Sequence, residues 1–239
     1  MKKSVFTLLI SAVAYASSAQ SQEVAPGDSI PWELRKQSFI YSTANLFSDP
    51  LIARMSLYNL LAENPTNVAL YDSLALSYLQ FNQNASAALV AQQALRIDPS
   101  DMFATEIAAS SLEQIGAKDR ALGFYEKLYL NNQDINTLYR VAFIQYELQR
   151  YAEATTNLDI IIENPKAAEE LIVFPTTDRQ GQNVPLNVAA HRIKAMMEEA
   201  KGNIEVAKAK YLEVLEMSPG FQVVQQQLRE LTKAAKEEE

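Results

Sequence analysis

The chain has 239 residues, of which 29 are acidic, 21 are basic, one is histidine and none is cysteine. Without cysteine it cannot form disulfides, thiolate zinc sites or iron–sulfur clusters, and a single histidine excludes metal sites built from several histidines. It has six glycines and no glycine-rich phosphate-binding motif. The composition therefore favours a helical protein without catalytic machinery, for which we expect no cofactor and no bound metal.

The first residues have the layout of a secretory signal peptide. Lys2 and Lys3 precede an apolar run over residues 5–16, and small residues follow up to Ala19. The alternative, an amino-terminal membrane anchor, is disfavoured because the run of about 12 apolar residues is shorter than the roughly 20 that a spanning helix needs. We expect a signal peptide over 1–19, cleavage after Ala19, export to the periplasm or cell envelope, and no membrane span in the mature chain.

The charge of the chain bears on its partners. The formal net charge is −8, and loss of Lys2 and Lys3 with the signal peptide would make it more negative. Such a charge repels phosphate backbones and anionic lipids, so nucleic acid and membrane surfaces are not expected partners. Residues 20–31 contain little that could be buried, which predicts a flexible leader, with regular structure beginning near Trp32.

The most informative feature beyond Trp32 is an internal repeat of 34 residues. Ala53, Ala87 and Ala121 are 34 residues apart, the equivalent Ala154 follows after 33 residues, and Ala207 follows after a further 53. Several prolines keep the same spacing. A fixed period of this length is typical of repeat architectures, and the longer last step indicates that about 20 residues are inserted once, before the last copy.

Each copy has the periodicity of two amphipathic helices that are separated by a polar break. Small residues recur where the two helices of a copy would approach each other closely. These pairs are Ala75 with Ala87, Ala109 with Ala121, Ala142 with Ala154, and Ala195 with Ala207. A bulky side chain at these positions would push the helix axes apart, so the pairs predict close helix–helix contacts.

In these positions the sequence resembles the tetratricopeptide repeat (TPR) family. The last copy carries Lys201-Gly202-Asn203-Ile204-Glu205-Val206-Ala207 followed by Tyr211, Val214, Leu215 and Pro219, and the fourth copy matches through Leu138, Val141, Ala142, Tyr151 and Ala154. The resemblance implies an all-α, right-handed α-solenoid of about five helix-turn-helix repeats, whose first helices line a concave groove. A short β-hairpin-like insertion and a C-terminal capping helix complete the expected fold.

The expected segments follow from this register. After the leader they are a divergent N-terminal repeat that acts as a cap (32–67), three repeats (68–101, 102–134 and 135–166), an insertion (167–187), a last repeat (188–221), and a capping helix with an acidic tail (222–239). Within the insertion, the runs Leu171–Phe174 and Val184–Leu186 predict a hairpin. Pro175 and Pro185 would limit it to a short ribbon.

The candidate partner-binding residues lie on the predicted groove face, which is acidic and aromatic. They are Leu76, Leu79, Phe103, Glu106, Tyr139, Phe143 and Tyr146. Tyr139, Phe143 and Tyr146 fall at i, i+4 and i+7, so they share one stripe of their helix. If exposed, this stripe would anchor a peptide. The alternative is that its rings pack against a neighbouring repeat or the insertion.

The function predicted from these features is a non-enzymatic protein–protein interaction scaffold that binds a peptide segment or a partner protein in the groove. The alternative is an enzyme or an enzyme-accessory subunit with a site in the groove or in the 167–187 insertion. His191 is the one side chain that could act as an ordinary base near neutral pH, but it occupies a packing position of its repeat. The sequence leaves the oligomeric state open.

Overall fold

The structure is a computed structural model that describes residues 30–176 and 181–237. The predicted signal peptide, most of the leader, the centre of the predicted hairpin loop and the last two residues of the acidic tail lie outside the described residues. The chain divides into two compact units, Met1–Glu63 and Asn64–Glu239. In the part of the chain that is described, none of the helices combines the length and the apolar character that a membrane span requires.

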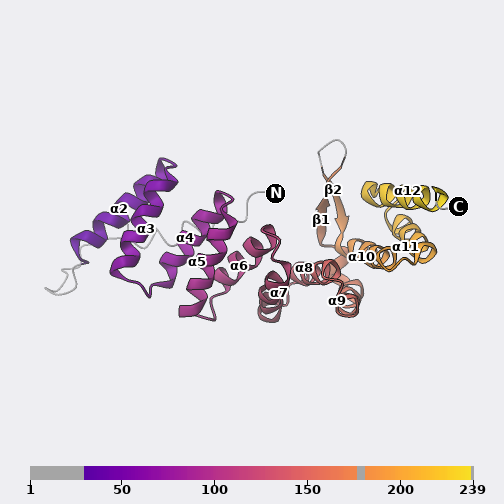
Figure 1. Ribbon diagram of the computed structural model, residues 1–239, viewed down its shortest axis with the longest axis horizontal. Helices are drawn as coiled ribbons and strands as arrows, with labels where there is room; N and C mark the ends of the chain where they lie inside the picture. The colour runs from indigo at the N-terminus through magenta and orange to yellow at the C-terminus, as the bar shows by residue number, and fades with distance from the viewer. Residues whose placement is uncertain (1–29, 177–180, 238–239) are drawn as a thin grey trace. The chain divides into compact units, whose positions relative to one another are not determined.

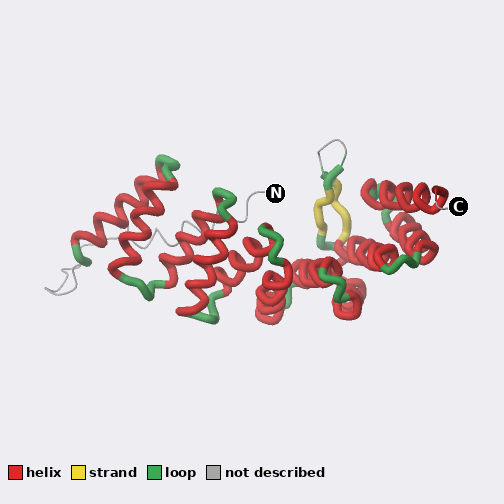
Figure 2. The backbone as a smooth tube through the Cα atoms, viewed as in Figure 1, coloured by secondary structure: helices red, strands yellow, loops and turns green. Residues whose placement is uncertain are grey.

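The first unit contains two antiparallel helices, α2 (Trp32–Leu46) and α3 (Pro50–Glu63), which a short turn joins (Figures 1 and 2). Helix α3 begins with proline at its first position, where the missing N–H has no intrahelical partner in any case. The Oδ1 atom of Asp49 accepts a hydrogen bond from the backbone N–H of Ile52 at 3.2 Å and so caps the same end. Ala44, Ala53 and Leu57 form part of the buried contact between the two helices.

The outer face of α2 is apolar. Trp32, Phe39 and Leu46 are spaced seven residues apart and therefore share one stripe, and all three are largely exposed. The buried side chains of α2, Gln37 and Ala44, lie on the opposite side of the helix. The role of this helix pair as a cap stays a prediction, and its apolar outer face differs from the polar outer face that the terminal repeats of solenoids usually present.

The second unit is built from four helix pairs and a final helix within the described residues. The pairs are α4 (Val68–Gln80) with α5 (Asn84–Ile97), α6 (Met102–Gln114) with α7 (Lys118–Asn132), α8 (Ile135–Glu147) with α9 (Tyr151–Glu163), and α10 (Leu186–Ala200) with α11 (Ile204–Met217); α12 (Gln222–Glu237) follows. Each helix contacts the next one in sequence, and first helices of neighbouring pairs also touch, α4 with α6 and α8 with α10. This is the predicted helix-turn-helix repetition.

The predicted close contacts are confirmed. All eight alanines of the four pairs, from Ala75 with Ala87 to Ala195 with Ala207, are completely buried. A methyl group is the largest side chain that lets two helix axes approach to the lower end of the usual 8–10 Å range. The repeat period is therefore set by the positions at which the helices of one pair meet.

The turns between paired helices also repeat. One residue of each turn has a positive φ, between 56° and 80°, and these residues lie at equivalent positions: Ser48, Asn82, Gly116, Gln149 and Gly202. In each turn the next residue donates its backbone N–H to a carbonyl five residues earlier, at 2.8–2.9 Å. This is the Schellman arrangement, which ends a helix with a left-handed residue. Because the turn at Ser48 follows the same geometry, the first helix pair belongs to the same repeat series.

The insertion forms a short antiparallel hairpin of β1 (Leu171–Phe174) and β2 (Gln182–Pro185), preceded by a 3-10 turn, η2 (Pro165–Ala168). Phe174 and Val184 are buried, whereas Leu171 and Val173 are exposed, so one face of the ribbon packs on the helices. The prediction that Leu186 belongs to the second strand is wrong. Leu186 is instead the first residue of α10, because its fully buried side chain joins the core of the last repeat.

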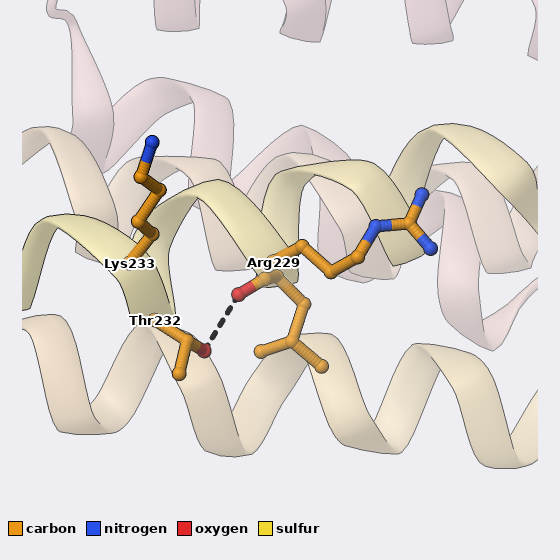
Figure 3. Close-up of a pocket in the computed structure, with 4 residues that line it drawn as sticks. Arg229, Thr232 and Lys233 are labelled. Carbon is orange, nitrogen blue, oxygen red and sulfur yellow. Dashed lines mark hydrogen bonds between the residues drawn. The ribbon is translucent and has the colours of Figure 1, made fainter.

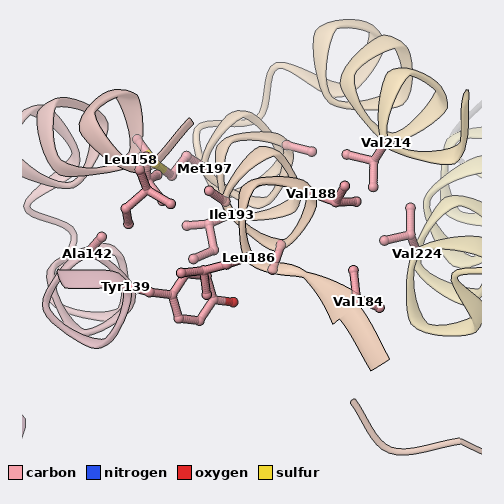
Figure 4. Packing of buried hydrophobic residues seen from close by; sticks show 14 of the residues in the cluster. Tyr139, Ala142, Leu158, Val184, Leu186, Val188, Ile193, Met197, Val214 and Val224 are labelled. Atoms are coloured by element: carbon pink, nitrogen blue, oxygen red, sulfur yellow. The ribbon is translucent and has the colours of Figure 1, made fainter. Parts of the chain in front are cut away.

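The largest buried cluster of the second unit lies where α8, α9, the hairpin, α10, α11 and α12 meet (Figure 4). The rings of Phe174 on β1 and Phe221 before α12 lie 4.8 Å apart within it. Val224 and Leu231 bury one side of α12. The predicted capping helix is thus present, and the hairpin is part of the same core.

Candidate functional site

The predicted groove residues occupy the first helices of the pairs, but the structure does not expose them equally. Glu106 is exposed and Phe103 keeps 44% of its surface on α6. Leu76 and Leu79 on α4 are half-buried and pack against the cluster formed by α4, α5 and α6. The remaining three predicted residues, the aromatic stripe of α8, differ from one another.

The prediction of an exposed aromatic stripe is wrong for Tyr139, of which 7% is exposed. Its ring points toward Leu186, the first residue of α10, and lies near Ile193 of the same helix (Figure 4). The physical reason is that α10 and the hairpin before it bring core side chains against α8, which helical periodicity alone does not reveal. Burial raises the pKa of Tyr139 to about 12.

Phe143 and Tyr146 are half-buried rather than exposed. Their ring centroids are 6.1 Å apart, and the ring of Tyr146 lies 6.3 Å from that of Tyr151 on α9. The ammonium group of Lys201 lies 5.5 Å from the centroid of the Tyr151 ring. The aromatic rings therefore form a partly exposed cluster between α8, α9 and the end of α10, whose outer edge could still contact a ligand.

The repeat register shows which positions correspond to one another. Asp72, Glu106, Tyr139 and Arg192 are equivalent positions on α4, α6, α8 and α10, separated by the same steps of 34, 33 and 53 residues as the alanines. We call these four positions the first-helix row. It begins with two acidic residues and ends with a basic one.

Asp72, at the start of the row, has a carboxyl oxygen that lacks a hydrogen-bond partner. Its Oδ1 atom is buried and forms no hydrogen bond within the described part of the chain. Burial, followed by the negative charge of Asp101, raises the pKa of Asp72 from 3.8 to about 7. Asp101 cannot relieve this repulsion by turning away, because its Oδ1 atom caps α6 and accepts hydrogen bonds from the N–H groups of Phe103 and Ala104 at 2.8 and 3.1 Å.

Arg192 is a functional candidate that the sequence analysis missed. It is half-buried, its Nε atom donates to Oε1 of Gln227 on α12 at 2.8 Å, and its Cζ atom lies 5.3 Å from the ring centroid of Phe174. The signal was available in the sequence, since the 53-residue step that relates Ala142 to Ala195 also relates Tyr139 to Arg192. The groove predicted as acidic and aromatic therefore has a basic end.

A second set of equivalent positions, two turns further along the first helices, forms a repeated polar contact with the second helices. The hydroxyl of Tyr125 donates to Oε2 of Glu113 at 2.8 Å, and at the equivalent positions the hydroxyl of Tyr211 donates to Oε2 of Glu199 at 2.6 Å. Glu113 also forms an ion pair with Arg140 of the next first helix, at 3.2 Å. These carboxylates are held in fixed positions by partners within the protein.

The described residues were compared with the requirements of a metal site and of an ordinary base. No group of three or more histidine, aspartate or glutamate side chains there could hold a metal ion. His191 is half-buried on α10, where burial and the nearby charge of Lys194 lower its pKa.

Two surface hollows involve α12. One is lined by four residues of α12 alone, Leu228, Arg229, Thr232 and Lys233, and the hydroxyl of Thr232 in it donates to the carbonyl of Leu228 at 2.7 Å (Figure 3). The other lies between α12 and the residues that follow β1, including Pro175 and Thr176. Among the described residues, only α12 lines the first hollow. Neither hollow is lined by a residue of the first-helix row.

No family model and no curated protein matches the sequence. Solved structures do match. A tetratricopeptide repeat protein from Parabacteroides merdae ATCC 43184 is 19% identical, with a TM-score of 0.61 over 84% of this chain and 73% of that one. The MamA protein is 15% identical, with a TM-score of 0.58 over 77% of this chain and 91% of that one.

YrrB, described as a TPR protein with an unusual peptide-binding site, is 15% identical, with a TM-score of 0.50 over 75% of this chain and 84% of that one. At these identities the likeness concerns the fold. Together with the repeated turns and the buried alanine pairs, it shows that the chain has the fold of tetratricopeptide repeat proteins.

Proposed function

We propose that the chain is a protein-interaction module that binds a segment of a partner protein along the first-helix row. The observation that carries this proposal is the contrast between two sets of equivalent positions. The positions at which paired helices meet are alanine in all four pairs of the second unit, whereas the row holds Asp72, Glu106, Tyr139 and Arg192. The fold requires the alanines, but it does not require charged groups in the row.

The charged ends of the row also lack full compensation within the protein. The buried Oδ1 atom of Asp72 has no hydrogen-bond partner in the described residues, and Arg192 has no carboxylate within 4 Å there. Uncompensated polar groups destabilise a fold by roughly 1–3 kcal/mol each and are typical of binding sites. The peptide-binding site of YrrB, on a related fold, is consistent with this use of the surface.

Site-specific photo-crosslinking tests the proposal. A photoreactive phenylalanine analogue at Glu106, which is exposed on the row, should form an adduct with a partner in cells. The same analogue at Leu89, which is 68% exposed on the second helix α5, is the matched control. Equal adduct yields at the two positions, or none at Glu106, would contradict binding along the row.

We further propose that the mature protein is exported and starts at Gln20. This rests on the positively charged and apolar layout of residues 2–19. Intact-mass analysis of an envelope fraction should give a chain that begins at Gln20. A pool that retains Met1 and stays in the cytoplasm would contradict export.

A further inference from the structure

One side of α2 carries three large apolar side chains that no described part of the first unit covers. We call Trp32, Phe39 and Leu46 the α2 stripe; each of them is 69–77% exposed. Residues seven apart on a helix lie two turns apart on the same side, so the three side chains are in line. Together they expose on the order of 400 Å² of mostly apolar surface, an area that on a monomer is often functional.

The repeat register shows what this side of a first helix contacts elsewhere. Phe39 has two apolar equivalents in the second unit, Ile107 on α6 and Ile193 on α10, at the steps that relate the paired alanines. Both are buried: Ile107 clusters with Ala91 of α5, and Ile193 clusters with Leu158 of α9 (Figure 4). In each case the covering helix belongs to the preceding pair. Phe39 therefore occupies a position that a preceding helix pair covers, and the described residues contain no pair before α2.

A second copy of α2 matches the α2 stripe by symmetry. Phe39 lies midway between Trp32 and Leu46 in the sequence. In a two-fold pair of antiparallel helices, the axis passes through Phe39 and brings the two Phe39 rings together. The same axis places each Trp32 beside the Leu46 of the other copy. The stripe is therefore complementary to itself.

The charges of α2 favour this antiparallel orientation. Its charged residues, Glu33, Arg35 and Lys36, all lie near its beginning, and its second half is uncharged. In an antiparallel pair, Arg35 and Lys36 lie beside the uncharged half of the other helix, whose carbonyl end has a partial negative charge. A parallel pair would instead place like charges beside each other, which is unfavourable.

Other segments of the chain offer the α2 stripe a poorer partner. The exposed residues of α12 among those described are all polar, namely Gln222, Gln226, Arg229, Glu230 and Lys233. A head-to-tail contact between copies would therefore bury charged groups against apolar ones, which is costly. The leader before α2 has one large apolar residue between positions 20 and 29, Val24, which is too little to cover three side chains.

We propose that the chain forms a two-fold homodimer in which the α2 stripes of two copies pack against each other in antiparallel orientation. With the aliphatic stems of Arg35 and Lys36, the two copies bury on the order of 1,000 Å² in total, which is at the lower limit for a specific interface. We therefore expect a dissociation constant of roughly 1–100 μM. Each dimer carries two copies of the first-helix row, but the dimer does not depend on what the row binds.

Sedimentation velocity tests the dimer with the chain that starts at Gln20, which contains every described residue. Its average mass should rise from one chain to two as the concentration increases. Phe39→Glu places two like charges at the two-fold axis and should weaken the dimer by about 100-fold or more. Leu89→Glu, at an equally exposed apolar position on α5, is the matched control and should dimerise as the unmodified chain does. An unmodified chain that stays monomeric at about 1 mM would overturn the proposal.

Disulfide trapping tests the antiparallel orientation, because the chain has no cysteine of its own. Two copies of Phe39→Cys meet at the axis and should form a disulfide on oxidation, whereas Leu89→Cys, the control, should not. Two copies of Trp32→Cys lie about 20 Å apart in this dimer, which is too far for a disulfide. A mixture of Trp32→Cys with Leu46→Cys should form one. Disulfides between two copies of Trp32→Cys, formed as fast as those of Phe39→Cys, would overturn the proposal.

Two further results would assign the α2 stripe to another occupant and overturn the dimer. Association of the full chain that is lost when the chain starts at Gln20 would assign it to residues 1–19. A monomer that sediments with vesicles of phosphatidylcholine and phosphatidylglycerol, and loses them in Phe39→Glu, would assign the stripe to a lipid surface. Photo-crosslinking at Glu106 tests the proposed function separately, so that either proposal can fail without the other.

Discussion

Replacing Asp72 with asparagine should stabilise the protein at pH 8 and leave its stability unchanged at pH 4. In the unfolded chain Asp72 loses its proton near its ordinary pKa of 3.8, whereas in the folded chain it keeps the proton until about pH 7. Between these values the folded state binds more protons than the unfolded state. The free energy of unfolding therefore falls as the pH rises from 4 to 7, and the loss is complete above pH 7.

The size of the effect follows from the shift. Each pKa unit corresponds to about 1.4 kcal/mol, so the full shift would amount to about 4 kcal/mol. Asp72 is only half-buried, and solvent screening reduces this figure to about 1–2 kcal/mol. Asparagine has the shape of the protonated acid but cannot ionise. In a protein of this size the gain at pH 8 corresponds to roughly 2–8 °C in melting temperature.

Urea denaturation followed by circular dichroism at pH 4, 6 and 8 measures this directly. Glu163→Gln, at an exposed position at the end of α9, is the control and should change the free energy of unfolding by less than about 0.5 kcal/mol at each pH. The reasoning fails if Asp72→Asn shows the same pH dependence as the unmodified protein, or if it is the less stable of the two at pH 8.

Three further predictions test the fold. Ala142→Trp, in a completely buried contact, should lower the free energy of unfolding in urea by more than about 3 kcal/mol. The control Ala152→Trp, at an exposed position of α9, should leave it nearly unchanged. A stable Ala142→Trp variant would refute the register of the fourth repeat. Tyr139→Ala should lower the free energy of unfolding by about 3 kcal/mol or more, since its ring belongs to the core, and a shift below about 1 kcal/mol would restore it as a surface residue. Gln149→Gly should raise the melting temperature, because glycine adopts the φ of 60° at this position without steric strain. Gly116→Ala is the reverse change and should lower the melting temperature, although an added Cβ would meet no atom within 4 Å there. Opposite signs would contradict the role of the left-handed turns.

The repeat series could be predicted from the sequence because its signal is steric and local. An alanine is required wherever two helices of a pair meet, so Ala75, Ala109, Ala142 and Ala195 mark the register without any knowledge of neighbouring repeats. The hairpin could be predicted for a similar reason, since Leu171–Phe174 is a short apolar run bounded by turn-forming residues. The left-handed turns were less visible, because Ser48 and Gln149 are residues that rarely adopt a positive φ.

The exposure of the binding face could not be predicted in the same way. Helical periodicity assigns Tyr139, Phe143 and Tyr146 to one stripe, but whether that stripe is covered depends on what the next segment places against it. In the second and third repeats the next pair follows directly, and Glu106 stays exposed. After the fourth repeat the hairpin and the start of α10 intervene, and Tyr139 becomes part of the core.

The insertion therefore changes the chemistry of the row as well as its exposure. Where Asp72 and Glu106 present acids, the hairpin supplies the ring of Phe174 and α12 supplies the amide of Gln227, and these two groups hold a basic side chain in position. If a partner segment binds along the row, a row that is acidic at one end and basic at the other would favour one direction for a segment whose own two ends differ in charge. The insertion that interrupts the repeat would then be what gives the binding surface its direction.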